Sequence, residues 1–323
     1  YGFPESHAIS FALLGYASIW LKTHYPAAYV CALLNSQPMG FYAPHTLIDD
    51  ARRHGVEVRP IDVEHSHWDC TLEEGEDDWA LRVGVRYVSG LGSTSNEAYE
   101  VARSSGKFKT VEAFAGRTGF DRGSLSAMAH AGAFRSLNRD ERQLDNARDL
   151  CRRAAYWAVL RPRSKGERPA LRLADDPAAE FFGMTEMEEV RADFATAGLT
   201  AGRHPMAFIR NDLTASGVYS VAALSQVRNG RRVQVAGLII GRQHPGTANG
   251  FVFLSLEDET GLLNVVITPQ LFEKQRTEAT RYPLLLITGQ VQSQNGALSL
   301  KAQLLKPLLT HEHIAEVPSR DFR

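Results

Sequence analysis

Two glycines placed around one apolar residue, directly before a helical pattern, are the clearest candidate for chemistry in this chain. The segment reads Gly90-Leu91-Gly92-Ser93-Thr94-Ser95. Glycine lets backbone amides approach a phosphate, and the start of the following helix adds unpaired N–H groups and the positive end of its dipole. A turn of this kind binds the nucleic-acid backbone without reading bases. The alternative interpretation is a simple helix cap.

Basic residues lie near this turn in the sequence. Arg86, Lys107 and Lys109 are the candidate phosphate contacts, and residues 81–165 hold 16 lysines and arginines against 8 acidic residues. The whole chain has a net charge of −1, so positive charge is concentrated in this part. We therefore expect phosphate contacts to gather there. A solvated helical surface would give the same charge pattern.

Helical and strand patterns indicate which elements position these residues. Helical spacing predicts helices at residues 9–23, 27–34, 44–54, 94–104, 110–118, 122–131 and 140–160. Short strand patterns at residues 56–63, 68–72 and 79–85 interrupt this helical half. A proline-containing, charged segment at residues 161–177 is typical of a linker, and a further helix is expected near residues 184–197.

Five apolar, β-rich runs in the last third follow the order of an OB barrel. They lie at residues 232–241, 251–257, 262–268, 282–292 and 297–305, with a polar, helix-length segment between the third and fourth. OB folds bind single strands across strands two and three and at the loop between strands one and two. The candidate contacts are Arg242, His244, Phe251, Phe253, Asn264 and Lys301. The phenylalanines could instead fill the barrel, and the barrel could instead dock a protein.

The expected fold is therefore a multidomain α+β chain, with a mainly helical N-terminal half and a five-stranded OB barrel after it. No metal site is expected, because Cys31, Cys70 and Cys151 lie far apart and the pair His65 and His67 lacks a third ligand at suitable spacing. No apolar run is long enough to span a bilayer. We expect buried or unreactive thiols in a reducing cytoplasm and no membrane contact.

The first 69 residues resemble the end of the fingers region of bacterial DNA polymerase III alpha-type (C-family) polymerases. The matching motifs are Tyr1-Gly2-Phe3-Pro4-Glu5-Ser6-His7 and Trp20-Leu21-Lys22-Thr23-His24-Tyr25-Pro26-Ala27. Residues 33–42 and 50–56 resemble the error-prone, ImuC-type paralogue more than the replicative subunit. The resemblance implies that Ser6 and His7 face the phosphates of the incoming nucleotide. Helix capping is the alternative role of Ser6.

The resemblance also implies a tandem helix-hairpin-helix, in which a half-degenerate second copy ends in glycine-alanine-phenylalanine. Here Arg122, Gly123 and Ser124 begin that copy, and Ala131-Gly132-Ala133-Phe134 follows at the matching distance. The implied domains are the end of the fingers at residues 1–80, the tandem hairpins at 81–160, a linker with mixed helices at 161–230, the OB fold at 231–310 and a tail at 311–323.

Catalysis is expected to lie outside this chain. In this polymerase family the palm aspartates that hold Mg²⁺ precede the fingers, and no Asp-x-Asp motif occurs here. The absence of an initiator Met agrees with a piece of a longer protein. We expect Mg²⁺ as the cofactor of the full-length nucleotidyltransferase and no cofactor in this fragment, which should be inactive alone.

Partner expectations follow from the same resemblance. Replicative subunits carry a clamp-binding peptide between hairpins and barrel, but Ala178 stands where its glutamine would be, before Phe181 and Phe182. The sliding clamp would then be reached only indirectly, through an ImuB-type inactive Y-family partner. Primer-template duplex and single-stranded DNA are the expected substrates, in damage-induced mutagenesis and translesion synthesis. The alternatives are a module that docks the ImuB-type partner with little DNA contact, or the replicative alpha subunit itself.

Overall fold

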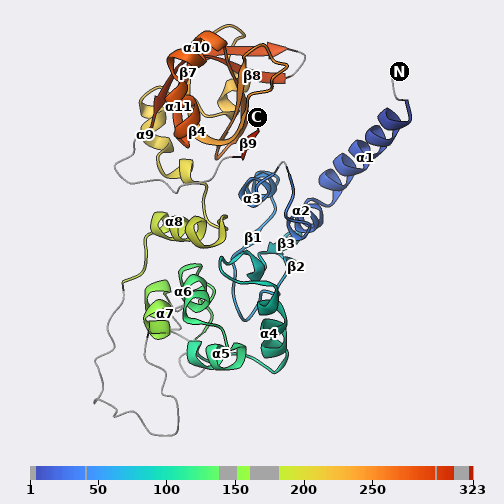
Figure 1. Cartoon of the computed structure of the whole chain (residues 1–323), viewed down its shortest axis with the longest axis vertical. Coiled ribbons are helices and arrows are strands. Elements are labelled where there is room, and N and C mark those ends of the chain that lie inside the picture. The colour runs from blue at the N-terminus through green and yellow to red at the C-terminus, as the bar shows by residue number, and fades with distance from the viewer. Residues whose placement is uncertain are drawn as a thin grey trace.

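A computed structural model describes residues 5–40, 42–137, 151–160, 182–294, 297–308 and 320–322 of the chain. Helices α2 to α7 and a small sheet form a helical body, and a β-barrel lies beyond α8 (Figure 1). Helix α1 extends away from both parts as a single rod (Figure 1). Within the described residues, no helix is both long and apolar enough to cross a membrane.

The chain begins with three helices, two of which start at a proline. They are α1 (Glu5–His24), α2 (Pro26–Asn35) and α3 (Pro44–Arg53). Proline is favourable at the first helical position, because its missing N–H would have had no partner inside the helix. Helix α2 buries Ala27, Val30, Cys31 and Leu34, which share one face at helical spacing. Helix α1 buries none of its residues, although its sequence is rich in large apolar side chains.

A small three-stranded sheet follows the first helices. Its strands are β1 (Val58–Arg59), β2 (Thr71–Glu74) and β3 (Trp79–Arg82), and β3 lies in the centre. Strand β1 is shorter than the pattern predicted, since Pro60 has no N–H to continue the ladder. The Arg82 guanidinium donates from Nε and Nη2 to the two carboxylate oxygens of Glu73, both at 2.8 Å. These bonds and those from Arg59 lower the pKa of Glu73 to about 2.

Short helices make up the rest of the body. They are η1 (Val85–Tyr87), α4 (Ser93–Ser104), α5 (Val111–Thr118), α6 (Arg122–His130), α7 (Arg152–Leu160) and α8 (Glu186–Ala197). Phe114 lies at the centre, and its ring contacts those of Phe108, Phe120 and Phe134 at 4.9, 5.9 and 5.2 Å. One hydrophobic core continues from α2 and α3 through the small sheet to α7. The domain boundary expected after residue 80 therefore falls inside a shared core.

Between α8 and the barrel the chain forms η2 (Pro205–Phe208), α9 (Arg210–Ala215) and η3 (Ala222–Gln226). Arg210 donates to Asp258 at 2.9 Å and also pairs with Glu259, so α9 is fixed to the end of a barrel strand. Helix α8 begins with a capping box in which Thr185 and Glu188 each accept the other's backbone N–H. The predicted clamp-peptide position Ala178 and its neighbour Phe181 lie outside the described residues, whereas Phe182 is exposed.

The barrel has five main strands and the connectivity of an OB fold. The strands are β4 (Arg232–Gln243), β5 (Val252–Asp258), β6 (Gly261–Ile267), β7 (Leu284–Gln294) and β8 (Ala297–Pro307), with α10 (Pro269–Lys274) and α11 (Arg276–Arg281) between β6 and β7. Strand β4 pairs with both β5 and β7, which closes the barrel, and β6 runs parallel to β8. Alternate residues Val252, Leu254 and Leu256 point into the core. The predicted α+β fold with a five-stranded OB barrel is confirmed.

One short strand was not expected. Strand β9 (Arg320–Phe322) lies in the segment predicted as a tail and pairs parallel with β4 at residues 241–243. It extends the barrel sheet beyond its five strands. Three residues without a long apolar run give no strand signal, because the hydrogen bonds come from the free edge of β4 rather than from local preference.

Candidate nucleic-acid interface

The first hairpin turn is open to a ligand. Gly90 has a φ of +84°, which favours glycine, and a Cβ at Gly90 or Gly92 would meet no atom within 4 Å. Gly92 is the N-cap of α4 and brings no side chain to accept from the first amides of that helix. Ser93 and Thr94 are exposed. The turn is fixed from behind, because Ser89 N–H donates to the Thr196 carbonyl at 2.7 Å. These are the features of an anion site at a helix start.

The second hairpin turn has a positive-φ glycine at the same place as the first, but a different N-cap residue at the start of its helix. Gly119, at a φ of +66°, precedes the buried Phe120 and then Asp121, as Gly90 precedes Leu91 and Gly92. Asp121 is the N-cap of α6, and its carboxylate accepts the Ser124 N–H at 2.7 Å. That bond lowers the pKa of Asp121. A carboxylate already occupies this helix start, so a phosphate would be repelled from it.

The predicted basic contacts lie in two different situations. Arg86 lies in η1, and its guanidinium donates to Asp69 at 2.8 Å and to the carbonyls of Asn35 and Gln37 at 3.1 Å. Lys107 and Lys109 are exposed in the loop after α4. That loop is at the far end of α4 from the Gly90 turn, about 18 Å away for a helix of this length. The two lysines and the turn would therefore contact phosphates several nucleotides apart, at about 3.4 Å per step.

Most of the remaining positive charge in this region holds the fold together. Arg122 donates to the Leu160 carbonyl, which ties the start of α6 to the end of α7. Further arginines with internal hydrogen bonds are Arg82, Arg103, Arg117, Arg152 and Arg153. The charge run in the sequence could not distinguish them from phosphate contacts, because only the folded chain brings their partners close.

Ser6 and His7 lie in the first described turn of α1 and are exposed. The Ser6 carbonyl accepts from Ser10 Oγ at 2.8 Å, and the His7 ring lies 4.5 Å from that of Phe11. Both side chains are on the rod that extends from the body, and their role at a nucleotide remains a prediction.

The barrel presents on its outer face a row of one aromatic, one aliphatic and one basic residue. Phe253 lies opposite Val266 on β6, and Val266 lies opposite Lys301 on β8. Because Val252 and Leu254 face the core, Phe253 faces outward and does not fill the barrel. Asn264 is exposed in the neighbouring row, opposite Ser255 and Ser299. This face therefore has the composition of a stacking surface.

Two more predicted contacts lie at the edge of this face. Phe251 is half-buried just before β5. His244 is exposed in the loop between β4 and β5, with its ring 5.3 Å from that of Phe272. Both positions are open to the surface beside Phe253.

Arg242 is a correction to the predicted interface. It is only 9% exposed, and its guanidinium donates to the Ala279 carbonyl at 2.9 Å and the Tyr282 carbonyl at 2.7 Å. These bonds satisfy carbonyls at the end of α11. Arg242 is therefore engaged in the fold, and we remove it from the candidate contacts.

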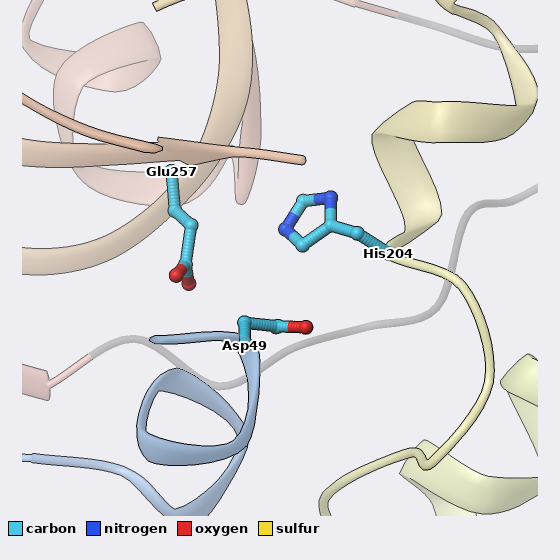
Figure 2. A group of neighbouring side chains, drawn as sticks. All are labelled: Asp49, His204 and Glu257. Atoms are coloured by element: carbon cyan, nitrogen blue, oxygen red, sulfur yellow. The ribbon is translucent and has the colours of Figure 1, made fainter. Parts of the chain in front are cut away.

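A cluster that sequence reasoning missed lies between the body and the barrel. Asp49 on α3, His204 before η2 and Glu257 on β5 are all buried, and one side-chain atom of each lies within 4.8 Å of the others (Figure 2). The three residues are far apart in the sequence, so no local spacing could have identified them.

The hairpin turns and the barrel define a nucleic-acid-binding class of protein. A family model described as a helix-hairpin-helix motif matches residues 55–144. A second model, described as an OB-fold nucleic acid binding domain, matches residues 233–308. The two matches cover the open turn at Gly90 and the outer row at Phe253.

Curated relatives narrow this class. The chain is 42% identical over 346 residues to an error-prone DNA polymerase of Methylococcus capsulatus, 44% over 336 residues to one of Pseudomonas syringae pv. tomato, and 42% over 330 residues to one of Burkholderia pseudomallei. Each match includes 100% of this chain and 30 to 32% of the relative. The chain is similar over its whole length to these error-prone DNA polymerases, and it spans about three tenths of the length of these relatives.

Proposed function

We propose that this chain is the C-terminal part of an error-prone DNA polymerase and holds the DNA backbone through the turn at Gly90 to Ser95. The observation that carries this is the exposed start of α4, where Gly92 brings no side chain to cap the helix and space is open around both glycines, although Ser95 N–H donates to the Gly92 carbonyl at 2.9 Å. Phosphate binding at such a site needs no base contact, so the grip is independent of sequence. This property suits an enzyme that moves along its substrate.

Nucleotide addition is assigned to the rest of the enzyme. In the full-length protein Mg²⁺ would be held by palm carboxylates outside this chain, so no catalytic step belongs to residues described here. Helix α1 supports this assignment, because Ile9, Phe11 and Leu14 are 67, 61 and 62% exposed on it. Large apolar side chains along a whole helix are normally covered by another part of the protein. Ser6 and His7 would then face the nucleotide in the assembled enzyme.

A titration of labelled primer-template DNA tests the backbone grip. Binding should weaken by about 10³-fold or less between 50 and 200 mM salt, since few phosphates are contacted. Replacing Lys107 and Lys109 with Glu should weaken it further and flatten the salt dependence. The matched control is Lys274→Glu on α10, on the barrel side of the molecule. Failure to bind tighter than about 10⁻⁴ M would sink the proposal.

The barrel is proposed to contact single-stranded DNA or a protein partner of the ImuB type. Phe253 favours stacking on a base, worth about 1 to 3 kcal/mol. The row Phe253, Val266 and Lys301 holds one cation, which is little for a strand of phosphates and favours a protein partner. Phe253→Ala, compared with Leu262→Ala on the same sheet, separates the two functions. Loss of oligonucleotide binding supports the DNA role, and loss of partner capture alone supports the docking role.

Damage-induced mutagenesis and translesion synthesis in the cytoplasm complete the proposal. The supporting observation is the name shared by the relatives, error-prone DNA polymerase. Clamp access would be indirect, because Ala178 replaces the glutamine of the clamp peptide. A pull-down that captures the clamp through Phe181 and Phe182 would favour the replicative alpha subunit instead.

A further inference from the structure

The contact between the helical body and the barrel is built around two buried carboxyl groups. Asp49 and Glu257 are 6% and 0% exposed, and His204 beside them is 5% exposed. One side-chain atom from each of the three lies within 4.8 Å of the others, and Figure 2 shows the three side chains coming from α3, the segment before η2 and β5. Two carboxylates that lie this close together and away from water repel each other strongly unless one of them carries a proton.

Two arginines lie at this contact, but they do not provide hydrogen bonds to every buried polar atom of the cluster. Arg53 donates to Glu257 Oε1 at 3.1 Å, and Arg52 lies 3.8 Å from Asp49 Oδ1 while it also donates to the Gly202 carbonyl. Glu257 Oε2 and His204 Nε2 are buried without a hydrogen-bond partner. A buried acceptor of this kind is costly when ionised, whereas a protonated Oε2 would become a donor.

The tautomer of His204 decides between a metal ion and a proton. His204 Nδ1 accepts the Met206 N–H at 3.1 Å, so this nitrogen carries no hydrogen. Neutral imidazole then has its hydrogen on Nε2, the atom that points at the carboxyl groups. Burial lowers the pKa of His204 to about 3, which keeps the ring neutral. An N–H cannot bind a cation, and it is well suited to donate to a carboxylate.

We infer that Asp49 and Glu257 share one buried proton, and that this proton fastens the OB barrel to helix α3. In this proposal the proton sits on Glu257 Oε2 and is shared with the Asp49 carboxylate, since the ligand atoms of Asp49, His204 and Glu257 lie within 4.8 Å of one another. Loss of the proton leaves two carboxylates facing each other and loosens the contact. Titratable and charged groups on every neighbouring element enter this balance: His45, Asp50, Arg52 and Arg53 on α3, Arg203 beside His204, Arg210 on α9, and Asp258 and Glu259 after Glu257.

The direction of the pKa shift supports this inference. Burial, and then the nearby Asp49 charge, raise the pKa of Glu257 above its ordinary value of 4.5. The folded chain therefore binds more protons than the unfolded chain above that pH. Stability should fall as pH rises from about 4.5 toward and past neutrality.

Infrared spectroscopy of the full 323-residue chain at neutral pH tests the proton directly. The wild type should show a protonated-carboxyl band that Glu257→Gln abolishes, and the matched variant Glu273→Gln, at an exposed position on α10, should leave the band in place. Asp49→Asn should weaken the band, because removal of the neighbouring charge lets Glu257 ionise. This second variant keeps the test decisive if Glu257→Gln does not fold. A wild type with no such band would overturn the inference.

The fastening role has its own measurement. Gln at position 257 keeps an acceptor for Arg53 and a donor for Asp49, so this variant should behave as permanently protonated. As the pH rises, the ratio of the unfolding equilibrium constant of the wild type to that of Glu257→Gln should increase by up to about tenfold per pH unit. Amide exchange in α3 and β5 should speed up at high pH in the wild type only. Parallel pH profiles for the two proteins would contradict the role.

Discussion

The two hairpin turns share one backbone plan but offer opposite chemistry to a phosphate. Gly90-Leu91-Gly92 leads into α4 with an open N-terminus, whereas Gly119-Phe120-Asp121 leads into α6 with a carboxylate on its first amides. Each turn keeps a positive-φ glycine and an apolar anchor. The two turns therefore agree at the first two positions and differ at the third, which is Gly92 in one and Asp121 in the other. We therefore propose that the second copy supports the first and holds no phosphate itself.

Gly92→Asp should have the largest effect, since it gives the first turn the chemistry of the second. We expect DNA affinity to fall by about tenfold, equivalent to about 1.4 kcal/mol, because the new carboxylate occupies the α4 amides and repels phosphate. Fluorescence anisotropy with primer-template DNA measures this change. Gly116→Asp, an exposed glycine on α5, is the control for added charge. Equal losses in the two variants would contradict the comparison.

Gly90→Ala and Gly119→Ala should separate stability from binding. Both sites have positive φ, so each alanine should cost about 1 kcal/mol of unfolding free energy. DNA affinity should fall only for Gly90→Ala, because the turn at Gly119 is proposed to contact no phosphate. Urea unfolding and anisotropy on the same preparations provide both numbers. A binding loss at Gly119 as large as at Gly90 would mean that both turns hold DNA.

Acid should act on the two turns through different carboxylates, Glu73 behind the first turn and Asp121 at the cap of the second. Arg82, three residues before η1, is held by ionised Glu73, whose pKa is about 2 in the folded chain against 4.5 ordinarily. A lowered pKa means that this stabilisation is complete above pH 4.5 and is lost as pH falls toward 2. The pair is partly exposed, so the loss should be at most about 1 kcal/mol. Hydrogen exchange, corrected for pH, should show faster opening around Gly90 as the pH falls, and Glu73→Gln should remove that pH dependence without changing the acid response around Gly119.

Asp121→Asn should have the smallest effect and the opposite sign. Asparagine still caps α6, but the negative charge is gone. DNA affinity should therefore rise, by a few-fold at low salt, with the thermal midpoint nearly unchanged. Anisotropy at two salt concentrations measures this gain. A fall in affinity would indicate that Asp121 supports binding through a contact of its own.

The helices and strands were predicted well, because the residues that determine them are close together in the sequence. Proline at Pro26 and Pro44, the glycine turn at Gly90 and the five apolar runs of the barrel each depend on near neighbours in the sequence. The shortness of β1 also followed from Pro60, although its exact ends did not. Strand β9 could not be predicted, since its pairing depends on a distant edge.

Site residues were harder to predict, because their availability depends on tertiary partners. Arg86 and Arg242 look like phosphate contacts in the sequence, yet both guanidinium groups donate to carbonyls that the fold brings close. Phe253 is the opposite case. The sequence allowed it to face either the core or the solvent, and the strand register places it on the outer face. The cluster of Asp49, His204 and Glu257 gave no signal because its members come from three separate elements.

Helix α1 has a practical consequence for handling this protein. Its apolar side chains contribute nothing to the core, and Lys22 joins it to the body by a 2.7 Å ion pair with Asp50. In concentrated solution such a rod should promote self-association and poor crystal order. A chain that starts at Tyr25 would keep every buried residue of the core and would lack the exposed apolar side chains of α1.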